Sequence, residues 1–177
     1  MTSIGDSAFR WCTSLTSIEI PESVTSIGEW TFTDCQSLTS VKIPESVTSI
    51  GDSAFSGCYN LTSIEIPESV TSIGGFAFSG CSSLTSIKIP KSVTSIGRYA
   101  FESSGLTSIE ISEGVTSIDA DAFWGCSRLT SVVIPQSVTS IGGGAFLLCN
   151  NLTNIYGTAG SYAETFASEN GYTFIPQ

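Results

Sequence analysis

The amino-acid sequence predicts a mainly β repeat solenoid, in which 23-residue rungs stack through parallel strands and a short helix caps the C-terminal end. Two regularities predict it: leucine and phenylalanine each recur at this period, with a single spacing of 22. The leucines are Leu15, Leu38, Leu61, Leu84, Leu106, Leu129 and Leu152. One rung buries too little apolar surface to offset the entropy of ordering its backbone, so we expect rungs to fold only as a stack.

Each rung is predicted to contain two short strands. Residues 86–90 alternate polar and apolar side chains, include β-branched residues and stop at Pro90, which is typical of a short strand. Residues 93–96 form a second β-branched stretch that ends at Gly97, where a turn forms easily. An Ala-Phe-x-x-Cys segment then returns the chain to the leucine of the next rung.

The chain divides into a predicted solenoid at residues 1–156 and a C-terminal cap at residues 157–177. The solenoid holds a half rung, six full rungs and the start of a last rung. In the cap, Ser161 followed by Glu164 predicts a capping box. The helix is expected to stop at Gly171, before a last strand at residues 172–175. Its packing face is predicted to contain Tyr162, Ala163, Phe166 and Ala167.

Two irregularities interrupt the pattern. In the fifth full rung one residue is missing, and the usual Cys, Pro and Gly are replaced by Ser103, Ser112 and Asp119. We expect the coil to bend or loosen there. Met1 falls in the middle of a repeat, without an N-terminal cap. We therefore expect a fragment, an engineered chain, or an end that another molecule covers.

The repeating unit reads L-T-S-I-x-I-P-x-S-V-T-S-I-G-x-x-A-F-x-x-C-x-x. It resembles the BspA-like leucine-rich repeat, also called the Treponema pallidum type, in its Ile-Pro pair and its A-F-x-x-C-x-x-L return. The match covers residues 1–156, and the tail resembles the C-terminal cap of bacterial members. The resemblance implies a right-handed leucine-rich repeat coil. It also implies a cell-surface or secreted, extracellular protein that adheres to host matrix or to other cells, with no catalytic residues to carry over.

Composition argues against several classes of protein. The net charge of −10 opposes binding to nucleic acid or to anionic membranes. The sequence has no histidine, which removes the commonest general base and metal ligand. We therefore predict a chain that is not an enzyme, with no catalytic residues, no metal and no cofactors. The longest apolar run, residues 145–149, is too short for direct membrane insertion, and no secretory signal peptide follows Met1.

Six rungs carry one cysteine each, at Cys12, Cys35, Cys58, Cys81, Cys126 and Cys149. Stacking places neighbouring cysteines within the Cα range of a disulfide. Parallel, inward-pointing side chains, however, aim their Cβ vectors alongside one another. We predict a ladder of buried free thiols, with disulfides as the alternative.

Charged residues are predicted to lie on the surface. One outward column of the first strands alternates in sign through Glu19, Lys42, Glu65, Lys88 and Glu110, which supports strand register. The best acidic cluster combines Asp119, Asp121, Glu102 and Glu113. We interpret it as solvated acidic surface, and a calcium site is the alternative.

Variation between rungs concentrates around the Ala-Phe segment. Large aromatic residues occupy these positions where they are predicted to point outward, and such residues are favoured at protein interfaces. The alternative is that each ring only packs over its neighbours. The predicted partner-binding residues are Trp11, Trp30, Phe76, Tyr99 and Trp124.

Three functions follow from these features. The first is a protein–protein interaction or adhesion module with a protein or glycoprotein partner, host matrix being one candidate. The second is a self-assembling structural repeat domain or engineered scaffold, in which the uncapped first rung makes a homo-oligomer or filament. The third is ice binding through the regular threonine columns, although threonine hydroxyls beside turns commonly bond to the backbone.

Overall fold

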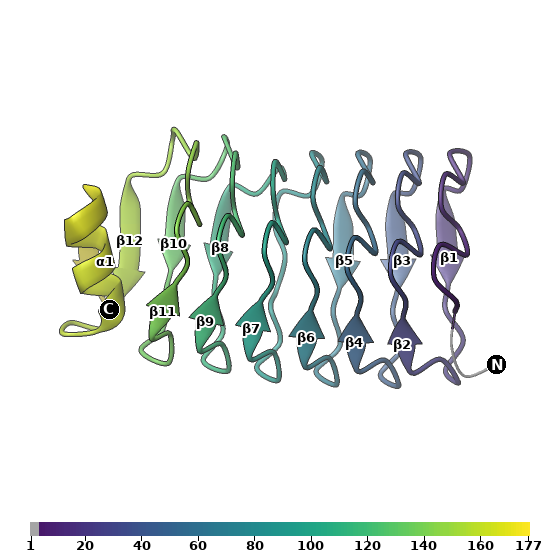
Figure 1. The fold of residues 1–177 in the computed structure, drawn as a ribbon, viewed down its shortest axis with the longest axis horizontal. Coiled ribbons are helices and arrows are strands. Elements are labelled where there is room, and N and C mark those ends of the chain that lie inside the picture. Colours follow the sequence, from purple (N-terminus) through teal and green to yellow (C-terminus); the bar gives the residue numbers. More distant parts are fainter. Residues whose placement is uncertain (1–3) are drawn as a thin grey trace.

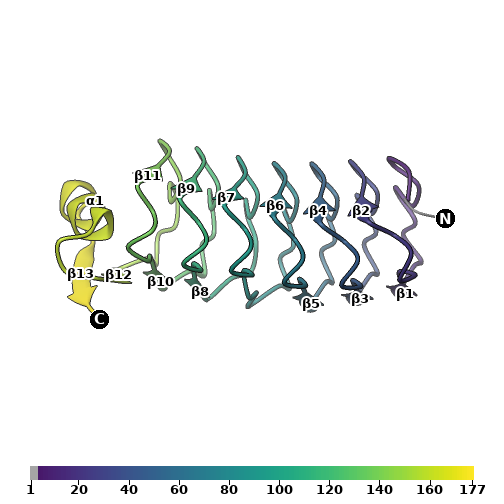
Figure 2. The same cartoon turned by 90° about the horizontal axis from the view of Figure 1, so that it is seen from below.

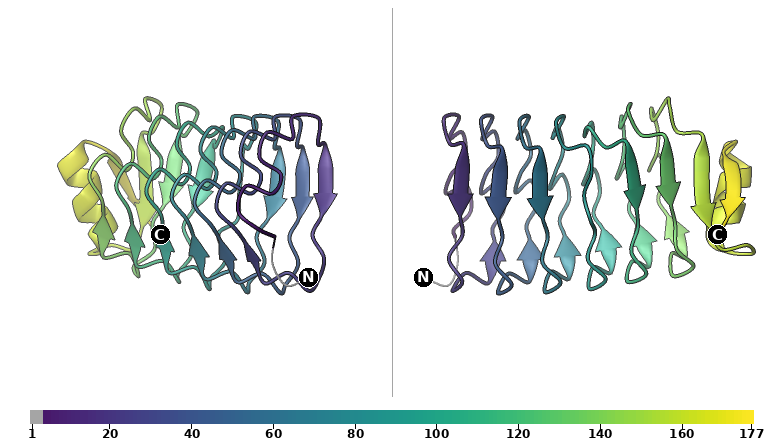
Figure 3. Two further views of the ribbon diagram at one scale, coloured as in Figure 1. Left: turned by 45° about the vertical axis from the view of Figure 1, so that its right-hand side comes forward. Right: turned by 180° about the vertical axis from the view of Figure 1, so that it is seen from behind.

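The computed structural model describes residues 4–177 as an elongated stack of rungs, with the first described rung and the C-terminal helix at opposite ends (Figure 1). The rungs follow one another as turns of one coil (Figure 3, left), and Figure 2 shows them side by side along the long axis. The predicted parallel-strand solenoid with one short C-terminal helix is confirmed.

The first strands of the rungs form two parallel sheets on one side (Figure 3, right). Their outer residues face solvent and their middle residue faces the core, as the alternation of polar and β-branched residues predicts. One sheet contains β1 (Ser17–Glu19), β3 (Ser40–Lys42) and β5 (Ser63–Glu65). The other contains β8 (Ser108–Glu110), β10 (Ser131–Val133), β12 (Asn154–Gly157) and β13 (Thr173–Pro176).

The second strands form one continuous parallel sheet on the other side. Each contributes only a serine and the isoleucine of the Thr-Ser-Ile segment before the chain turns, and this isoleucine is buried except in the last strand, where Ile141 is half-buried. The six strands are β2 (Ser26–Ile27), β4 (Ser49–Ile50), β6 (Ser72–Ile73), β7 (Ser95–Ile96), β9 (Ser117–Ile118) and β11 (Ser140–Ile141).

The sheet of first strands is interrupted in the fourth full rung, which begins at Leu84. The sequence predicts the irregularity one rung later, in the fifth full rung. Residues 86–90 form no regular strand, so a gap separates β5 from β8 (Figure 1). The missing residue lies between Leu84 and Leu106, so the shorter return follows directly on the C-terminal side of the break in the ladder. The prediction that Ser103 replaces the cysteine was wrong: Ser104 is the buried residue, with its hydroxyl 3.3 Å from the sulfur of Cys126.

The shortened rung brings two backbone segments close together at Gly114, where most other rungs have serine. A Cβ at Gly114 would collide with the carbonyl oxygen of Lys91. We expect Gly114→Ala to lower the free energy of unfolding by about 1–3 kcal/mol, because two backbones must separate. Gly143→Ala is the control, since a Cβ there meets nothing within 4 Å. Equal urea midpoints for the two variants would contradict this expectation.

Phenylalanine forms the spine of the core. Consecutive rings from Phe9 to Phe146 stack nearly parallel, with centroids 5.1–5.5 Å apart. The side chains between the end rungs are fully buried. Each rung therefore supplies one layer of a continuous aromatic stack, which explains why phenylalanine keeps the period as strictly as leucine does.

The cap begins differently from the predicted capping box. Helix α1 (Tyr162–Asn170) follows Ser161, but the Ser161 hydroxyl is buried and has no hydrogen-bond partner among residues 4–177. The Glu164 carboxylate accepts a hydrogen bond from the backbone N–H of Gly160 instead, at 2.6 Å. Gly171 ends the helix in the left-handed conformation, as predicted, and β13 then pairs with β12. The division at residue 156 stays a prediction.

Candidate functional site: an aromatic edge on the solenoid

The turns that carry the Ala-Phe segment lie on one edge of the solenoid. In each turn the residue before alanine adopts a positive φ, and so does the second residue after phenylalanine. Backbone N–H groups at alternate positions then donate to carbonyls of the following rung; those of Trp30, Phe32 and Asp34 reach residues 52, 54 and 56 at 2.8–2.9 Å. This backbone geometry sets the direction of the variable side chains.

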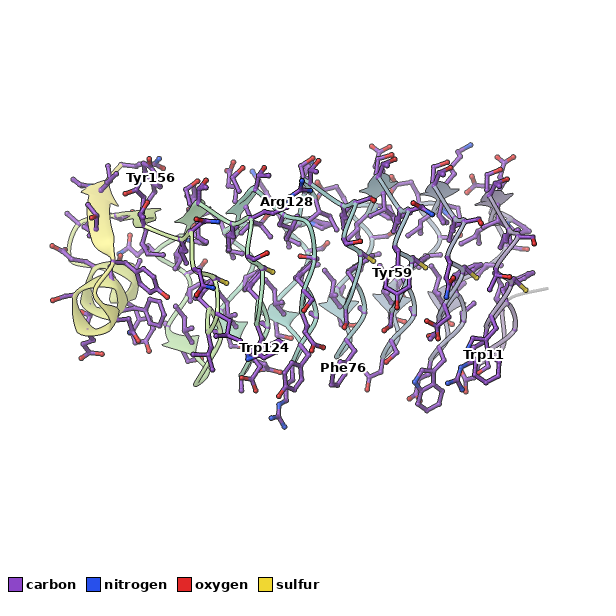
Figure 4. The ribbon with its side chains drawn as sticks, turned by 90° about the horizontal axis from the view of Figure 1, so that it is seen from above. Trp11, Tyr59, Phe76, Trp124, Arg128 and Tyr156 are labelled. Atoms are coloured by element: carbon purple, nitrogen blue, oxygen red, sulfur yellow. The ribbon has the colours of Figure 1, made fainter. Side chains whose placement is uncertain are left out.

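Three of the five predicted binding residues are well exposed on this edge. Trp11 is 62% exposed, Trp30 41% and Phe76 40%, whereas Tyr99 and Trp124 are half-buried. Figure 4 shows Trp11, Phe76 and Trp124 along the same side of the molecule. We call the set of Trp11, Trp30, Phe76, Tyr99 and Trp124 the aromatic edge.

Phe76 and Tyr99 form the centre of the aromatic edge. Their ring centroids lie 4.7 Å apart at 20°. The guanidinium of Arg98 lies 4.8 Å from the Tyr99 ring centroid and donates a hydrogen bond to Asp121 at 3.2 Å. This contact raises the pKa of Arg98. Asp121, predicted as part of an acidic cluster, is therefore paired with a cation.

Trp11 belongs to a second group, nearer the N-terminal end. Its indole N–H donates to Asp34 at 3.1 Å, and the Arg10 guanidinium lies 4.3 Å from its ring centroid. Trp30 makes no ring contact within residues 4–177. The structure thus brings Phe76 and Tyr99 together and leaves Trp11 and Trp30 as separate exposed rings.

The most exposed apolar residues beyond this set lie at the C-terminal end of the same edge. Leu147 is 55% exposed and Leu148 48%. They border a cleft of about 490 Å³ between the last rung and α1, whose far wall includes Tyr162, Phe166 and Tyr172. Sequence reasoning placed Tyr162 on the packing face, but it is exposed. The shape of the cleft depends on how the cap packs against the last rung. The repeat pattern does not predict this packing, because the cap is not a repeat.

The opposite, strand-lined side is polar. Lys42 bonds to Glu19 at 3.2 Å, in the predicted sign-alternating column. Lys88 departs from that column and bonds to Glu68 at 3.0 Å, which lowers the pKa of Glu68. Lys88 lies in the rung without a first strand, so its side chain is not held above Glu65.

The threonine columns use their hydroxyls internally. In most rungs the hydroxyl donates to a threonine carbonyl of the preceding rung; Thr39 reaches Thr16 at 3.0 Å, and Thr71 reaches Thr48 at 3.2 Å. These donors therefore stabilise the stack, which leaves little for an ice-lattice match.

The cysteines form the predicted ladder of free thiols, five of them buried and Cys12 exposed. Each buried thiol donates to a phenylalanine carbonyl of the preceding rung, as Cys58 does to Phe32 at 3.2 Å. Within residues 4–177 there is no group of three or more His, Cys, Asp or Glu residues that could hold a metal ion. No helix in this range is long and apolar enough to cross a membrane.

The repeats of this chain match a known protein family. The model of the BspA-type leucine-rich repeat region matches residues 2–128 and 48–168, with six copies. The chain belongs to the BspA-type leucine-rich repeat family. Leucine-rich repeat proteins are typically protein-interaction or adhesion modules, and their solenoid is a typical non-enzymatic scaffold.

Solved structures show the same BspA-type fold. The Treponema pallidum leucine-rich repeat protein TpLRR is 29% identical with a TM-score of 0.82, and the match covers 98% of this chain and 78% of that one. The pneumococcal vaccine antigen PcpA is 19% identical with a TM-score of 0.75, covering 92% of this chain and 41% of that one. None of the curated proteins matches the chain.

Proposed function

We propose that this BspA-type chain is a non-catalytic adhesion module of a cell-surface or secreted protein, and that it binds a protein or glycoprotein partner through the aromatic edge. The observation that carries the proposal is the backbone of Trp30 and Phe76, with φ values of 53° and 55°. The left-handed conformation costs a bulky residue about 1–2 kcal/mol.

The fold itself does not require aromatic residues at these positions. Ser7, Ser53 and Gly144 occupy equivalent places in other rungs with the same backbone conformation. Packing recovers only part of the cost, since Trp30 remains 41% exposed and Phe76 40% exposed. Rigid, exposed aromatic rings that cost stability are better explained by contact with a partner.

The test replaces both aromatic residues with glycine, which adopts this backbone freely. For Trp30→Gly/Phe76→Gly we expect a free energy of unfolding within about 1 kcal/mol of the parent, because relief of strain offsets lost packing. We expect at least tenfold weaker binding to immobilised extracellular-matrix glycoproteins, measured by surface plasmon resonance.

The matched control changes the strand-lined side. Glu19→Gln/Lys42→Gln removes an exposed ion pair and should leave both stability and binding unchanged. Binding that survives the glycine variant, or that is lost equally in the control, would show that the aromatic edge is not the binding surface. Lost stability without lost binding would assign the rings to packing.

A further inference from the structure

The last rung differs from the earlier ones in its backbone hydrogen bonds. In the rung before it, the N–H groups of Asp121, Phe123 and Gly125 donate to the carbonyls of residues 143, 145 and 147, at 3.2, 2.8 and 2.8 Å. All earlier rungs do the same at the equivalent positions, except at Tyr99 in the shortened rung.

In the last rung the equivalent donors are the N–H groups of Gly144, Phe146 and Leu148. None of the three has a hydrogen-bond partner among residues 4–177. The chain forms α1 here instead of another Ala-Phe turn. The helix closes the core, where Phe166 takes the place of the next ring at 5.8 Å from Phe146, but it supplies no carbonyls to these donors.

The three residues line the cleft of about 490 Å³ between the last rung and the cap. Exposed Leu147 and Leu148 border this cleft on the rung side, and Tyr162 and Tyr172 on the cap side. The cleft thus combines a row of regularly spaced backbone donors with apolar walls, which is how sheet edges receive extended peptides.

We propose that this cleft, which we call the terminal donor cleft, binds a peptide segment of a partner protein. The segment would lie along residues 142–148 and place alternate carbonyl oxygens on the N–H groups of Gly144, Phe146 and Leu148. Every earlier rung already binds such a segment, namely the Ala-Phe turn of the rung that follows, through all three donors or, in the shortened rung, through two.

The surroundings favour a neutral peptide backbone over a free anion. Glu169 lines the terminal donor cleft, and the chain carries a net charge of −10, so anions are repelled. Phe166 already fills the position beside Phe146. The side chain of the segment that faces the core must therefore be small.

The probe is an acetylated, amidated peptide with the sequence Gly-Asn-Ser-Ala-Ala-Ser-Gly. It copies residues 51–57, which fill the donors of an earlier rung, with asparagine in place of Asp52 to keep the peptide neutral and alanine in place of Phe55. In the free protein we expect the amides of Gly144, Phe146 and Leu148 to exchange with deuterium much faster than those of Asp121, Phe123 and Gly125. Peptide addition should shift the three signals in ¹H–¹⁵N NMR spectra and slow their exchange.

Two tryptophan variants give the controlled comparison. Gly143 has open space at its Cβ and no positive φ, so Gly143→Trp should fold normally and fill the terminal donor cleft. We expect it to weaken peptide binding at least tenfold. Glu29→Trp places the same side chain at the equivalent position of a distant rung and should leave peptide binding unchanged.

Several outcomes would overturn the proposal. The first is that millimolar peptide shifts none of the three amides, and the second is that Gly143→Trp binds as well as the parent. A third is slow exchange of the three amides in concentrated protein that becomes fast on dilution, since a second copy would then be the occupant. None of these readouts involves matrix binding by the aromatic edge, so the two proposals fail separately.

Discussion

Replacing Phe78 with alanine should lower the free energy of unfolding by about 3–5 kcal/mol, among the largest effects expected from a single substitution in this chain. The Phe78 ring is fully buried, with Phe55 at 5.5 Å on one face and Phe101 at 5.4 Å on the other. Its removal leaves a cavity inside the aromatic stack, and neighbouring rungs cannot close it without breaking their own ladders. Urea unfolding followed by circular dichroism measures the change.

The matched control for this variant is Phe76→Ala, two residues earlier in the same turn. Within residues 4–177 the Phe76 ring stacks on Tyr99 alone, and it is 40% exposed whereas Phe78 is fully buried, so its loss should cost no more than about 1 kcal/mol. Similar losses for the two variants would mean that the stack stabilises the chain no more than a surface contact does.

The second large effect is alkaline destabilisation. Burial raises the pKa of Cys35 to about 11 and that of Cys81 to about 12, whereas an ordinary thiol has a pKa of about 8.5; burial raises the pKa of Cys58 as well. Because the folded-state pKa values are raised, this stability is complete below the ordinary pKa and is lost as pH rises. Each thiol that ionises only on unfolding removes about 1.4 kcal/mol per pH unit. The pKa of Cys149 is raised as well, so four thiols act in the same direction, and we expect a loss of several kcal/mol between about pH 9 and 11.

The measurement is the urea midpoint from neutral pH to pH 11, with reductant present. Cys81→Ser provides the control, since Ser104 shows that a serine fits this column. The free energy of unfolding of this variant should fall less steeply with pH than that of the parent. The difference between the two slopes should be about 1.4 kcal/mol per pH unit. A midpoint that does not change between neutral pH and pH 10, or an unchanged slope in Cys81→Ser, would argue against thiol ionisation as the cause.

The periodic part of the fold could be predicted from the sequence because each position of the repeat has the same surroundings in every rung. Phenylalanine, leucine and cysteine recur where the side chain meets its own copy in the next rung, so spacing alone identifies the core. The same reasoning failed for residues 86–90, whose composition is that of a strand. Strand formation there depends on the distance to the next rung, and a single missing residue alters that distance.

The candidate surfaces were less predictable. Spacing placed Trp11, Trp30 and Phe76 outside the core, and their exposure agrees with that. It did not indicate their left-handed backbone, because serine and glycine share these positions and the turn is imposed by hydrogen bonds between rungs. The terminal donor cleft arises from bonds that the last rung lacks, and no residue type marks it.

The one-way hydrogen bonding between turns has a consequence for how such a protein can change in length. Each rung offers donors to the rung after it and acceptors to the rung before it, and these two faces are almost identical along the stack. A duplicated or deleted block of 23 residues, cut at equivalent positions such as Leu38 and Leu61, rejoins faces that already fit. Gain or loss of whole rungs by recombination is therefore structurally conservative, whereas loss of one residue within a rung breaks a sheet.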